Sequence, residues 1–579
     1  MSDSWYLDAC QTWNRVLDTS ALRHADKDFL VCGSQRISFG EFRRRTLDFA
    51  KGLMHLGVAK GDVVGIWMTN SIDWAICQYA IHRTGALLLP LYSYYRGGEL
   101  EYALRQAGVR TLIMSDSFVG KVDALGILLE SMPALENLTR ENFAIEAFPA
   151  LRSIVVVAES RVLPSRFSHA DVTALGQRHV TDAELLRREL EISPFDVMNI
   201  MYTSGTTGFP KGGMSMHITN LCTLSLWSGM ARLTPDDVIL CHVPMFTNFG
   251  GLYGVGLGLY NGCRTVVTEQ FDPGLSLELI ERERVTYVPG TPSMFRMLLD
   301  HEDIGRRDLS SLRGGHVAGA PLTDETMRGI IEVLGVRDVM QAWGLSECGG
   351  LSTVSTREDP IDKRLNTVGK PLASARVCVV DPNALVPVAA GASGEIWLGD
   401  VHPGSCVGKG YFGMPEKTVA VITGDGWFRT GDIGFFDNEG YLHVTGRVDD
   451  MFTVGGFNVY PAEIEKTLER HESVREAYVV PVPDRRLGNV PVAWVAIDKS
   501  QPVNPEAIVK WCRTQMTPQK APRRVFFYWP GELPMTPVGK VKRKELAQRS
   551  AALVAAQEPR TGPPPDVTQR QPSMQGEPP

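Results

Sequence analysis

Helical and strand patterns alternate along the first third of this 579-residue chain, and this alternation limits the folds open to it. An S-x-x-E sequence at 38–41, typical of a helix start, precedes apolar residues at helical spacing and a glycine at position 57. A second helix-like segment spans 74–82. Short apolar runs typical of strands lie at 63–68, 86–91, 154–158 and 264–268. Helices that alternate with short apolar strands predict a layered α/β architecture with a largely parallel sheet.

The pattern changes near residue 447. A helix is expected over 460–470, with Pro461 in its first turn, and strands are expected over 477–482, 490–497 and 524–528. We therefore predict a large N-terminal domain of α/β subdomains at 1–446 and a small, mobile α+β domain at 447–550. The tail at 551–579 is expected to be disordered, because its last part is rich in Pro and Gln and almost without apolar residues.

The composition argues against several other classes of protein. A net charge of −7 is unusual for a nucleic-acid binder, and no segment approaches the ~20 apolar residues that cross a bilayer. The acidic N-terminus does not resemble a secretory signal. The ten cysteines form no C-x-x-C pair, which disfavours a zinc site or a disulfide framework and favours free thiols in a reducing cytoplasm.

The most informative segment is the loop at 202–212, which is rich in hydroxyls and glycines and ends in a lysine. Glycines let backbone N–H groups close on an anion, hydroxyls add donors, and a lysine adds positive charge. The loop therefore suits a polyphosphate, although it lacks the Gly-Lys-Ser/Thr end of a Walker loop. The alternative is a hydroxyl-rich surface turn. The candidate residues are Thr203, Ser204, Gly205, Thr206, Thr207, Gly208 and Lys211.

This loop resembles the phosphate loop of the adenylate-forming superfamily. That superfamily includes acyl- and aryl-CoA synthetases, nonribosomal peptide synthetase adenylation domains and beetle luciferases. Further segments resemble its motifs and follow in its order, at 319–322, 343–347, 427–432, 446–450 with 455–461, and 534–540. The resemblance covers about residues 30 to 550. It implies that the chain uses ATP, Mg²⁺ and coenzyme A to activate a small-molecule carboxylic acid.

The resemblance also assigns roles on the nucleotide side. Glu347 is the implied Mg²⁺ ligand, since Mg²⁺ on ATP takes one or two carboxylates beside phosphate oxygens. Lys540 is implied to stabilise charge during adenylation, although the basic residues that follow it leave a solvated surface run as the alternative. Trp343 offers a flat face to a purine, with a plain core aromatic as its alternative. The implied adenine and ribose residues are Gly319, Ala320, Pro321, Trp343, Asp432 and Arg447.

The remaining implied roles concern the acid and coenzyme A. Asp449 is the implied hinge, and Gly455, Gly456 and Phe457 are implied to border the coenzyme A channel, with a tight turn as the plainer interpretation. The implied acid pocket is His242, Phe246, Thr247, Gly250, Gly290, Thr291, Ala318 and Gly344. Several of these residues are small and most are uncharged. An apolar acid of some bulk is therefore expected, whether aryl, polycyclic or medium-chain.

Three residues depart from the superfamily's usual pattern. Thr247 stands where a histidine is common, Trp343 replaces a tyrosine and Ser346 replaces a threonine. These departures raise the hypothesis that adenylation is weak and that the chain is competent mainly for thioesterification of a supplied acyl-adenylate. Loading of a separate carrier protein, a luciferase-like oxygenase and a non-catalytic nucleotide binder are further alternatives. The sequence leaves the oligomeric state open. A two-step acyl-CoA ligase is the prediction.

Overall fold

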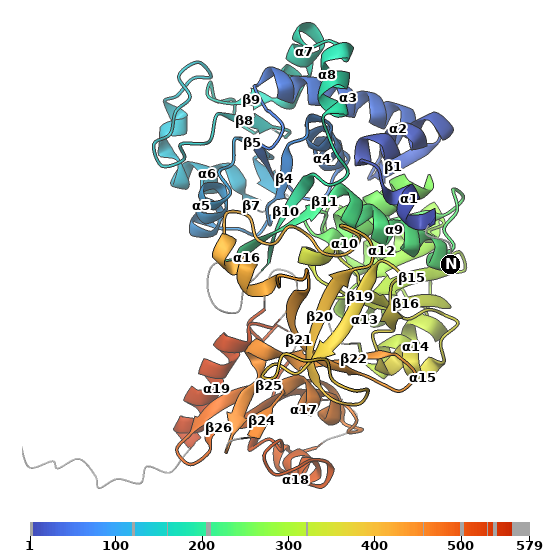
Figure 1. The fold of residues 1–579 in the computed structure, drawn as a ribbon, viewed down its shortest axis with the longest axis vertical. Helices are drawn as coiled ribbons and strands as arrows, with labels where there is room; N and C mark the ends of the chain where they lie inside the picture. The colour runs from blue at the N-terminus through green and yellow to red at the C-terminus, as the bar shows by residue number, and fades with distance from the viewer. Residues whose placement is uncertain are drawn as a thin grey trace, which may run out of the picture. The chain divides into compact units, whose positions relative to one another are not determined.

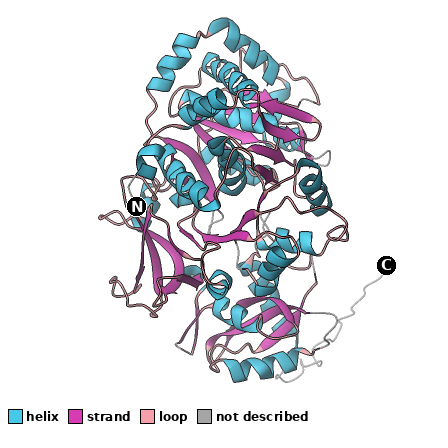
Figure 2. Cartoon of the chain, turned by 90° about the vertical axis from the view of Figure 1, so that its right-hand side faces the viewer, coloured by secondary structure: helices cyan, strands magenta, loops and turns pink. Residues whose placement is uncertain are grey.

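The computed structural model describes residues 4–118, 122–158, 160–203, 210–319, 322–455, 457–497, 503–529, 531–535 and 541–557. The chain, drawn in Figure 1, divides along its sequence into two compact units, with the boundary between Asp449 and Asp450. The sequence places this boundary at residue 447. Figure 2 shows helices on both sides of the strands in the N-terminal unit, in agreement with the predicted layered α/β fold.

One mostly parallel sheet of the N-terminal unit holds the strands expected at 63–68, 86–91 and 154–158. Its neighbours pair in parallel from β10 to β9, and only β11 runs antiparallel, against β10, among the described strands of this sheet. In spatial order the strands are β11 (Lys211–Met216), β10 (Val197–Thr203), β4 (Leu87–Pro90), β3 (Val63–Trp67), β5 (Thr111–Met114), β8 (Ser153–Val156) and β9 (Phe167–Ser168).

Helices accompany this sheet, and the first long one begins where the sequence predicts. Ser38 caps the first long helix, because its Oγ accepts a 3.2 Å hydrogen bond from the Glu41 backbone N–H. The Glu41 carboxylate bonds to Arg44, at 2.6 and 2.8 Å. The helices are α3 (Phe39–His55), α4 (Ile72–Thr84), α5 (Gly97–Gln106), α6 (Ala124–Ser131), α7 (His169–His179) and α8 (Asp182–Leu190).

A second sheet is parallel through its centre and antiparallel at its edges. Its strands, in spatial order, are β18 (Lys370–Pro371), β17 (Thr353–Val354), β16 (Asp338–Trp343), β15 (Gly314–Val317), β14 (Tyr287–Gly290), β12 (Val238–Cys241), β13 (Arg264–Val267), β1 (Asp28–Cys32) and β2 (Gln35–Ser38). Apolar residues of α12 (Pro273–Glu283), α13 (Pro292–Leu299) and α14 (Asp324–Glu332) pack on its strands and form a continuous core.

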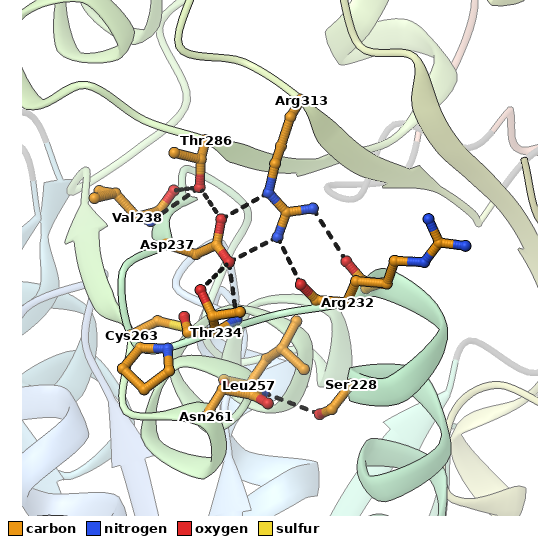
Figure 3. Close-up of polar contacts among 12 residues, drawn as sticks. Ser228, Arg232, Thr234, Asp237, Val238, Leu257, Asn261, Cys263, Thr286 and Arg313 are labelled. Atoms are coloured by element: carbon orange, nitrogen blue, oxygen red, sulfur yellow. Dashed lines mark hydrogen bonds and ion pairs between the residues drawn. The ribbon is translucent and has the colours of Figure 1, made fainter.

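A polar network aligns the amino ends of three neighbouring strands of this sheet (Figure 3). Asp237 precedes β12, Thr286 precedes β14 and Arg313 precedes β15. Asp237 accepts hydrogen bonds from Arg313 at 2.6 and 2.8 Å and from the Thr286 hydroxyl at 2.7 Å. Arg313 also donates to the carbonyls of Ala231 and Arg232, at the end of α9 (His217–Ala231). The network fixes the register of the strands, whose opposite ends carry the candidate site.

A smaller antiparallel sheet completes the N-terminal unit. Its strands are β19 (Ala375–Val380), β20 (Gly394–Asp400), β21 (Phe428–Phe436) and β22 (Leu442–Arg447). Asp432 of β21 lies opposite Arg447 of β22 in the register. The candidate nucleotide residues at 432 and 447 are therefore neighbours on one sheet.

The C-terminal unit has the predicted α+β composition. Its strands are β23 (Phe452–Val454), β24 (Phe457–Val459), β25 (Val474–Asp484), β26 (Gly488–Ile497) and β27 (Arg524–Phe527), and its helices are α17 (Pro461–Leu468), α18 (Pro505–Gln515) and α19 (Arg543–Gln557). The expected start of the disordered tail at 551 is wrong, because α19 continues to Gln557 through a run of strong helix formers. The rest of the predicted tail lies outside the described residues.

No helix in the described part of the chain is long and apolar enough to cross a membrane. All ten cysteines are free thiols, and most of them are buried.

Candidate active site

The candidate residues of the N-terminal unit gather at the carboxyl ends of parallel strands. His242 follows β12, Gly290 ends β14, Ala318 follows β15 and Trp343 ends β16. These four strands are neighbours in one sheet. In open α/β sheets, ligands bind at this edge. The fold thus brings together residues that lie up to a hundred positions apart in the sequence.

Glu347 lies buried in a setting of hydroxyl groups. Its carboxylate Oε1 accepts hydrogen bonds from Thr203 Oγ1 and from the Tyr411 hydroxyl, both at 3.2 Å. Only 6% of Glu347 is exposed, and the Cβ of any residue replacing Gly213 would approach its Cγ to 2.9 Å. Burial, together with the negative charge of Glu347, raises the pKa of Tyr411. Burial and the same charge raise the pKa of Tyr92 to about 12.

This donor set fits a magnesium ion. Among the described residues, no ion pair with Glu347 is found, and its carboxylate is met there by two hydroxyl groups. A buried carboxylate without a cationic partner is costly, and a divalent ion relieves that cost. Mg²⁺ also prefers a site with one or two carboxylates that leaves other positions to phosphate oxygens and water. Glu347 is therefore the described residue best suited to hold Mg²⁺.

The ends of the phosphate loop lie beside Glu347. Thr203 ends β10 and Lys211 begins β11, and the two residues pair directly across the antiparallel ladder. The Lys211 Nζ lies 5.2 Å from the centroid of the Tyr411 ring. Tyr411 thus contacts both the candidate metal ligand and the candidate phosphate lysine. The loop residues Ser204, Gly205, Thr206, Thr207 and Gly208 lie outside the described residues.

Three candidate nucleotide-binding residues are joined by a hydrogen bond and an ion pair. Trp343 Nε1 donates a 2.8 Å hydrogen bond to Asp432 Oδ2. Arg447 Nη1 lies 2.7 Å from Asp432 Oδ1 in an ion pair, and Arg447 Nη2 donates to the Thr430 carbonyl. Both oxygens of the Asp432 carboxylate are thereby oriented, and each keeps lone pairs for further donors such as ribose hydroxyls.

Gly319 ends the described part of the adenine-side loop in a conformation that favours glycine. Its φ is +91°, which lies in the left-handed region, so a side chain at this position would strain the backbone. Ala320 and Pro321 lie outside the described residues.

The acid-pocket segment after β12 is compact and partly aromatic. Phe246 is buried and lies against Tyr92, with ring centroids 4.9 Å apart. Thr247 caps α10 (Asn248–Gly250), since its Oγ1 accepts from the Gly250 N–H at 3.3 Å and donates to the Pro244 carbonyl at 2.7 Å. A Cβ at position 250 would lie 2.4 Å from that same carbonyl. Glycine is therefore required there by close backbone packing.

His242 is buried, and its ring is hydrogen-bonded within the protein. Its Nδ1 bonds to Ser276 Oγ at 3.1 Å and its Nε2 to the Pro289 carbonyl at 2.7 Å. Burial lowers the pKa of His242 to about 4, so the ring is neutral at physiological pH. Both ring nitrogens are used within the protein, and neither is free to meet a carboxylate.

The other acid-pocket candidates are small residues, and several of them have a local structural role. A Cβ at Gly290 would approach the Phe295 ring to 2.9 Å, and one at Gly344 would approach the Gly350 carbonyl oxygen to 1.9 Å. Thr291 caps α13, since its hydroxyl accepts from the Met294 N–H at 3.4 Å. Ala318 is 8% exposed at the end of β15. Close packing explains both glycines without reference to a ligand.

The candidate residues for domain motion and coenzyme A are only partly described. Asp449 is the last residue of the N-terminal unit. Gly455 has a φ of +57°, in the left-handed region, and its N–H donates to the Leu487 carbonyl at 2.8 Å, beside the pairing of β23 with β26. The backbone of Phe457 lies in β24. Gly456, the Phe457 side chain and Lys540 lie outside what the structure describes.

Two aromatic residues of the site were missed from the sequence. Tyr411 bonds to Glu347, and Tyr92 lies against Phe246 while its hydroxyl donates to the Tyr202 carbonyl at 3.0 Å. Neither tyrosine lies in a segment that resembles a superfamily motif. No local signal marks them, since their roles depend on segments that meet only in the fold.

Comparison with known proteins places these features in a family. The model for the AMP-binding enzyme family matches residues 17–412, and the model for the AMP-binding enzyme C-terminal domain matches residues 463–540. The chain belongs to the AMP-binding enzyme family. It is an adenylate-forming enzyme of the acyl-CoA ligase branch, as the sequence motifs predict, and its cofactors and substrates are ATP, Mg²⁺, coenzyme A and a carboxylic acid.

Curated relatives match this AMP-binding enzyme over nearly its whole length. It is 34% identical to YngI of Bacillus subtilis, provisionally named an acyl-CoA synthetase, over 94% of this chain and 97% of that one. It is 32% identical to the 3-[(3aS,4S,7aS)-7a-methyl-1,5-dioxo-octahydro-1H-inden-4-yl]propanoyl:CoA ligase of Mycobacterium tuberculosis, over 92% and 98%. It is 30% identical to the mitochondrial medium-chain acyl-CoA ligase ACSF2 of Bos taurus, over 93% and 87%.

A solved structure agrees with the AMP-binding enzyme in fold. The anthranilate CoA ligase AuaEII, in complex with anthranoyl-AMP, superposes with a TM-score of 0.80 at 27% identity. The match covers 94% of this chain and 98% of AuaEII. The predicted fold class, a large layered α/β unit with a small α+β unit, is confirmed by this agreement.

Proposed function

We propose that this enzyme converts a bulky, apolar carboxylic acid to its acyl-CoA thioester through an acyl-adenylate. The observation that carries the proposal is the character of the candidate acid segment. Phe246 and Tyr92 form an aromatic pair there, and the other candidate positions hold small, uncharged residues. His242 cannot supply a charge, because it is neutral and bonded on both nitrogens.

The names of two relatives support an acid of this kind. The ligase of Mycobacterium tuberculosis is named for a propanoyl group on a fused bicycle that carries two ketones, and ACSF2 is named for medium-chain acids. Both names describe acids with a large apolar body. Both relatives are CoA ligases, which favours coenzyme A over a carrier protein as the acceptor.

In the proposed first half-reaction the acid's carboxylate attacks the α-phosphorus of ATP and pyrophosphate leaves. Glu347 would hold Mg²⁺, which neutralises phosphate charge when it is bound. Asp432, oriented by Trp343 and Arg447, would accept from the ribose hydroxyls. Lys211 and Lys540 would balance the charge on the phosphoryl oxygens, a type of interaction whose loss costs about 10²–10³ in rate.

In the proposed second half-reaction the thiol of coenzyme A attacks the acyl carbonyl and AMP leaves. No covalent acyl-enzyme is needed, because the adenylate is already a good leaving group. Asp449 is proposed as the hinge residue between the two half-reactions, and Gly455, Gly456 and Phe457 as the border of the thiol channel. We also assign the protein to the cytoplasm, since its ten free thiols suit a reducing compartment.

The test is mass spectrometry of products from the purified protein, MgATP and a pool of aryl, polycyclic and medium-chain acids, with and without coenzyme A. The expected products are acyl-CoA in the full mixture and acyl-AMP when coenzyme A is left out. A panel in which only acetate-sized acids or amino acids react would contradict the proposed acid class.

A second arm separates the two half-reactions. Preformed acyl-adenylates are supplied with coenzyme A but without ATP. Thioester formation in this arm alone would assign the chain to thioesterification only. Acyl-AMP formation from a free acid rules that assignment out.

A further inference from the structure

We infer that His316 presents a hydrogen-bond donor to the acyl part of the substrate, and that the preferred acid therefore carries an oxygen acceptor, such as a ketone or hydroxyl, on its apolar body. This inference rests on the proposed function and names the acid class more narrowly. His316 is not among the residues that the superfamily motifs point to. It lies at the centre of β15, between the Arg313 network and Ala318.

A chain of three side chains fixes the protons of the His316 ring. Trp227 Nε1 donates to the Tyr287 hydroxyl oxygen at 3.0 Å, and that hydroxyl lies 3.0 Å from His316 Nδ1. Indole nitrogen only donates, so the Tyr287 proton is free to point at Nδ1. His316 then accepts at Nδ1 and carries its own proton on Nε2. Burial lowers the pKa of His316 to about 3, which keeps the ring in this neutral form.

Among the described residues, none forms a hydrogen bond with Nε2 of His316, although His316 is 0% exposed. Leaving a buried donor unsatisfied costs about 1–3 kcal/mol, and such groups are rare in native structures. Four aromatic rings surround the imidazole, with centroids 4.9 to 5.8 Å away: Trp227, Phe249, Tyr253 and Tyr287. An aromatic face is a poor substitute for an oxygen acceptor. The donor therefore calls for an acceptor that the described part of the chain does not supply.

The position of His316 connects this donor to the candidate acid pocket. His316 lies in β15, two residues before Ala318, which directly follows the strand. Phe249, whose centroid is 4.9 Å from the imidazole, lies in α10 between Thr247 and Gly250. His316 and its neighbour Phe249 thus lie in two separate segments that carry candidate acid-pocket residues.

The rings around His316 differ in a way that indicates the direction of approach. Trp227 and Tyr287 are 0% exposed and Tyr253 is 2% exposed, whereas Phe249 is only partly buried. Phe249 is therefore the one ring of these four that is partly accessible from outside the core. Phe249 lies two residues before the start of a π-helical stretch, Gly251–Gly256, and such π-helical turns occur frequently at functional sites.

The test compares matched acids on the wild type and on His316→Phe, which keeps an aromatic ring but removes the N–H. One acid set is octanoate with keto-octanoates that differ in the position of the ketone. The other is cyclohexylpropanoate with its ring-ketone analogue. Turnover is followed by acyl-CoA formation. Binding is followed by calorimetry with a non-hydrolysable ATP analogue, which gives a readout without turnover.

The wild type is expected to prefer at least one keto acid over its plain partner by about tenfold in kcat/KM, mainly through KM, as one well-made hydrogen bond allows. His316→Phe should bring this ratio to within about twofold. His316→Gln, whose amide N–H donates, should restore part of it, and Tyr287→Phe, which frees the imidazole, should weaken it. Thermal denaturation of each variant shows that the fold is kept.

The inference is overturned if the wild type prefers no keto acid, or if His316→Phe keeps the preference. If no acid turns over but calorimetry shows a keto preference that depends on His316, the inference stands and the proposed function fails. If plain and keto acids turn over equally well in every variant, the proposed function stands and the inference fails. If no acid binds or reacts, both fail together.

Discussion

Trp343 donates its indole N–H to the Asp432 carboxylate across a distance of 2.8 Å. The two residues are 89 positions apart and lie on different sheets, β16 and β21. In this chain a tryptophan thus does more than offer a flat face to a purine. It orients the carboxylate that we propose to bind the ribose, and it does so through a donor that a phenylalanine lacks.

Trp343→Phe tests this relationship directly. The variant keeps an aromatic face but leaves Asp432 without its indole donor. Since a hydrogen bond to a charged group contributes about 1.5–3 kcal/mol, we expect KM for ATP to rise by about tenfold or more while KM for the acid changes little. Steady-state kinetics of pyrophosphate release with each substrate varied in turn provides the measurement.

A second tryptophan supplies the matched control. Trp397 of β20 donates its Nε1–H to Glu395 at 2.9 Å, which is the same kind of bond outside the candidate nucleotide residues. Trp397→Phe should leave KM for ATP within about twofold of the wild type. Equal effects of the two substitutions on ATP would contradict the proposed role of Trp343.

Glu347→Gln is expected to lower the rate of adenylation by about 10²–10³. The glutamine keeps an oxygen that accepts from Thr203 and Tyr411, so local structure should change little, but the charge that we propose to hold Mg²⁺ is gone. Single-turnover formation of acyl-AMP over a series of Mg²⁺ concentrations gives the rate and the half-saturating metal concentration, which should rise.

Tyr411→Phe serves as the comparison for Glu347→Gln. It removes one hydroxyl from Glu347 and keeps the ring beneath Lys211. We expect a loss of about tenfold or less, in line with one neutral donor. Adenylation by Glu347→Gln at the wild-type rate, or with unchanged Mg²⁺ dependence, would show that the metal is held elsewhere.

The fold was largely predictable from local pattern. Apolar runs bounded by turns located β3, β4, β8 and β13 to within two residues at each end, because buried parallel strands need continuous apolar sequence. The end of α19 was missed, since Ala, Leu and Gln continue a helix without a change in periodicity that marks the domain's end. Sheet order depends on contacts between distant segments, and local pattern does not encode it.

The candidate site was predictable only where it repeats a known motif. Trp343, Asp432 and Arg447 were named from such motifs, and the structure brings them together. His242 was assigned to the acid pocket by resemblance to the superfamily, but both its nitrogens bond within the core. Tyr411 lies in no motif. Which atom of a side chain meets which neighbour follows from tertiary packing and is absent from one-dimensional spacing.

In the C-terminal unit, Glu469 is expected to make stability depend on pH. Burial raises its pKa to about 8, and the nearby charge of Glu465 adds to the shift. A carboxyl whose pKa is higher in the folded than in the unfolded state stabilises the fold at low pH, and this contribution is lost as pH rises through the folded-state value. The loss should run from about pH 4.5 to about pH 8.

Glu469→Gln removes this titration. Its free energy of unfolding should exceed that of the wild type by about 2 kcal/mol at pH 9, and the difference should shrink toward pH 5. Urea denaturation that follows the unfolding of this unit at both pH values gives the comparison. Glu472→Gln is the control, since Glu472 is exposed nearby. If the free energies of unfolding of Glu469→Gln and the wild type differ by the same amount at every pH, Glu469 is not the cause of the pH dependence.

Substitutions of Thr247, which stands where a histidine is common, test whether this position contributes to adenylation. Its hydroxyl is used locally, because it donates to the Pro244 carbonyl and accepts from the Gly250 N–H. Thr247→Ala should therefore act as the loss of a helix cap, lowering the free energy of unfolding by about 1 kcal/mol and changing KM for the acid by less than about threefold. Thr247→Ser keeps the hydroxyl and should behave as the wild type in denaturation and in acyl-AMP formation. If Thr247→Ala instead slows acyl-AMP formation strongly and leaves thioesterification of a preformed adenylate intact, the hydroxyl contributes to adenylation itself and its local bonds must break when the acid binds.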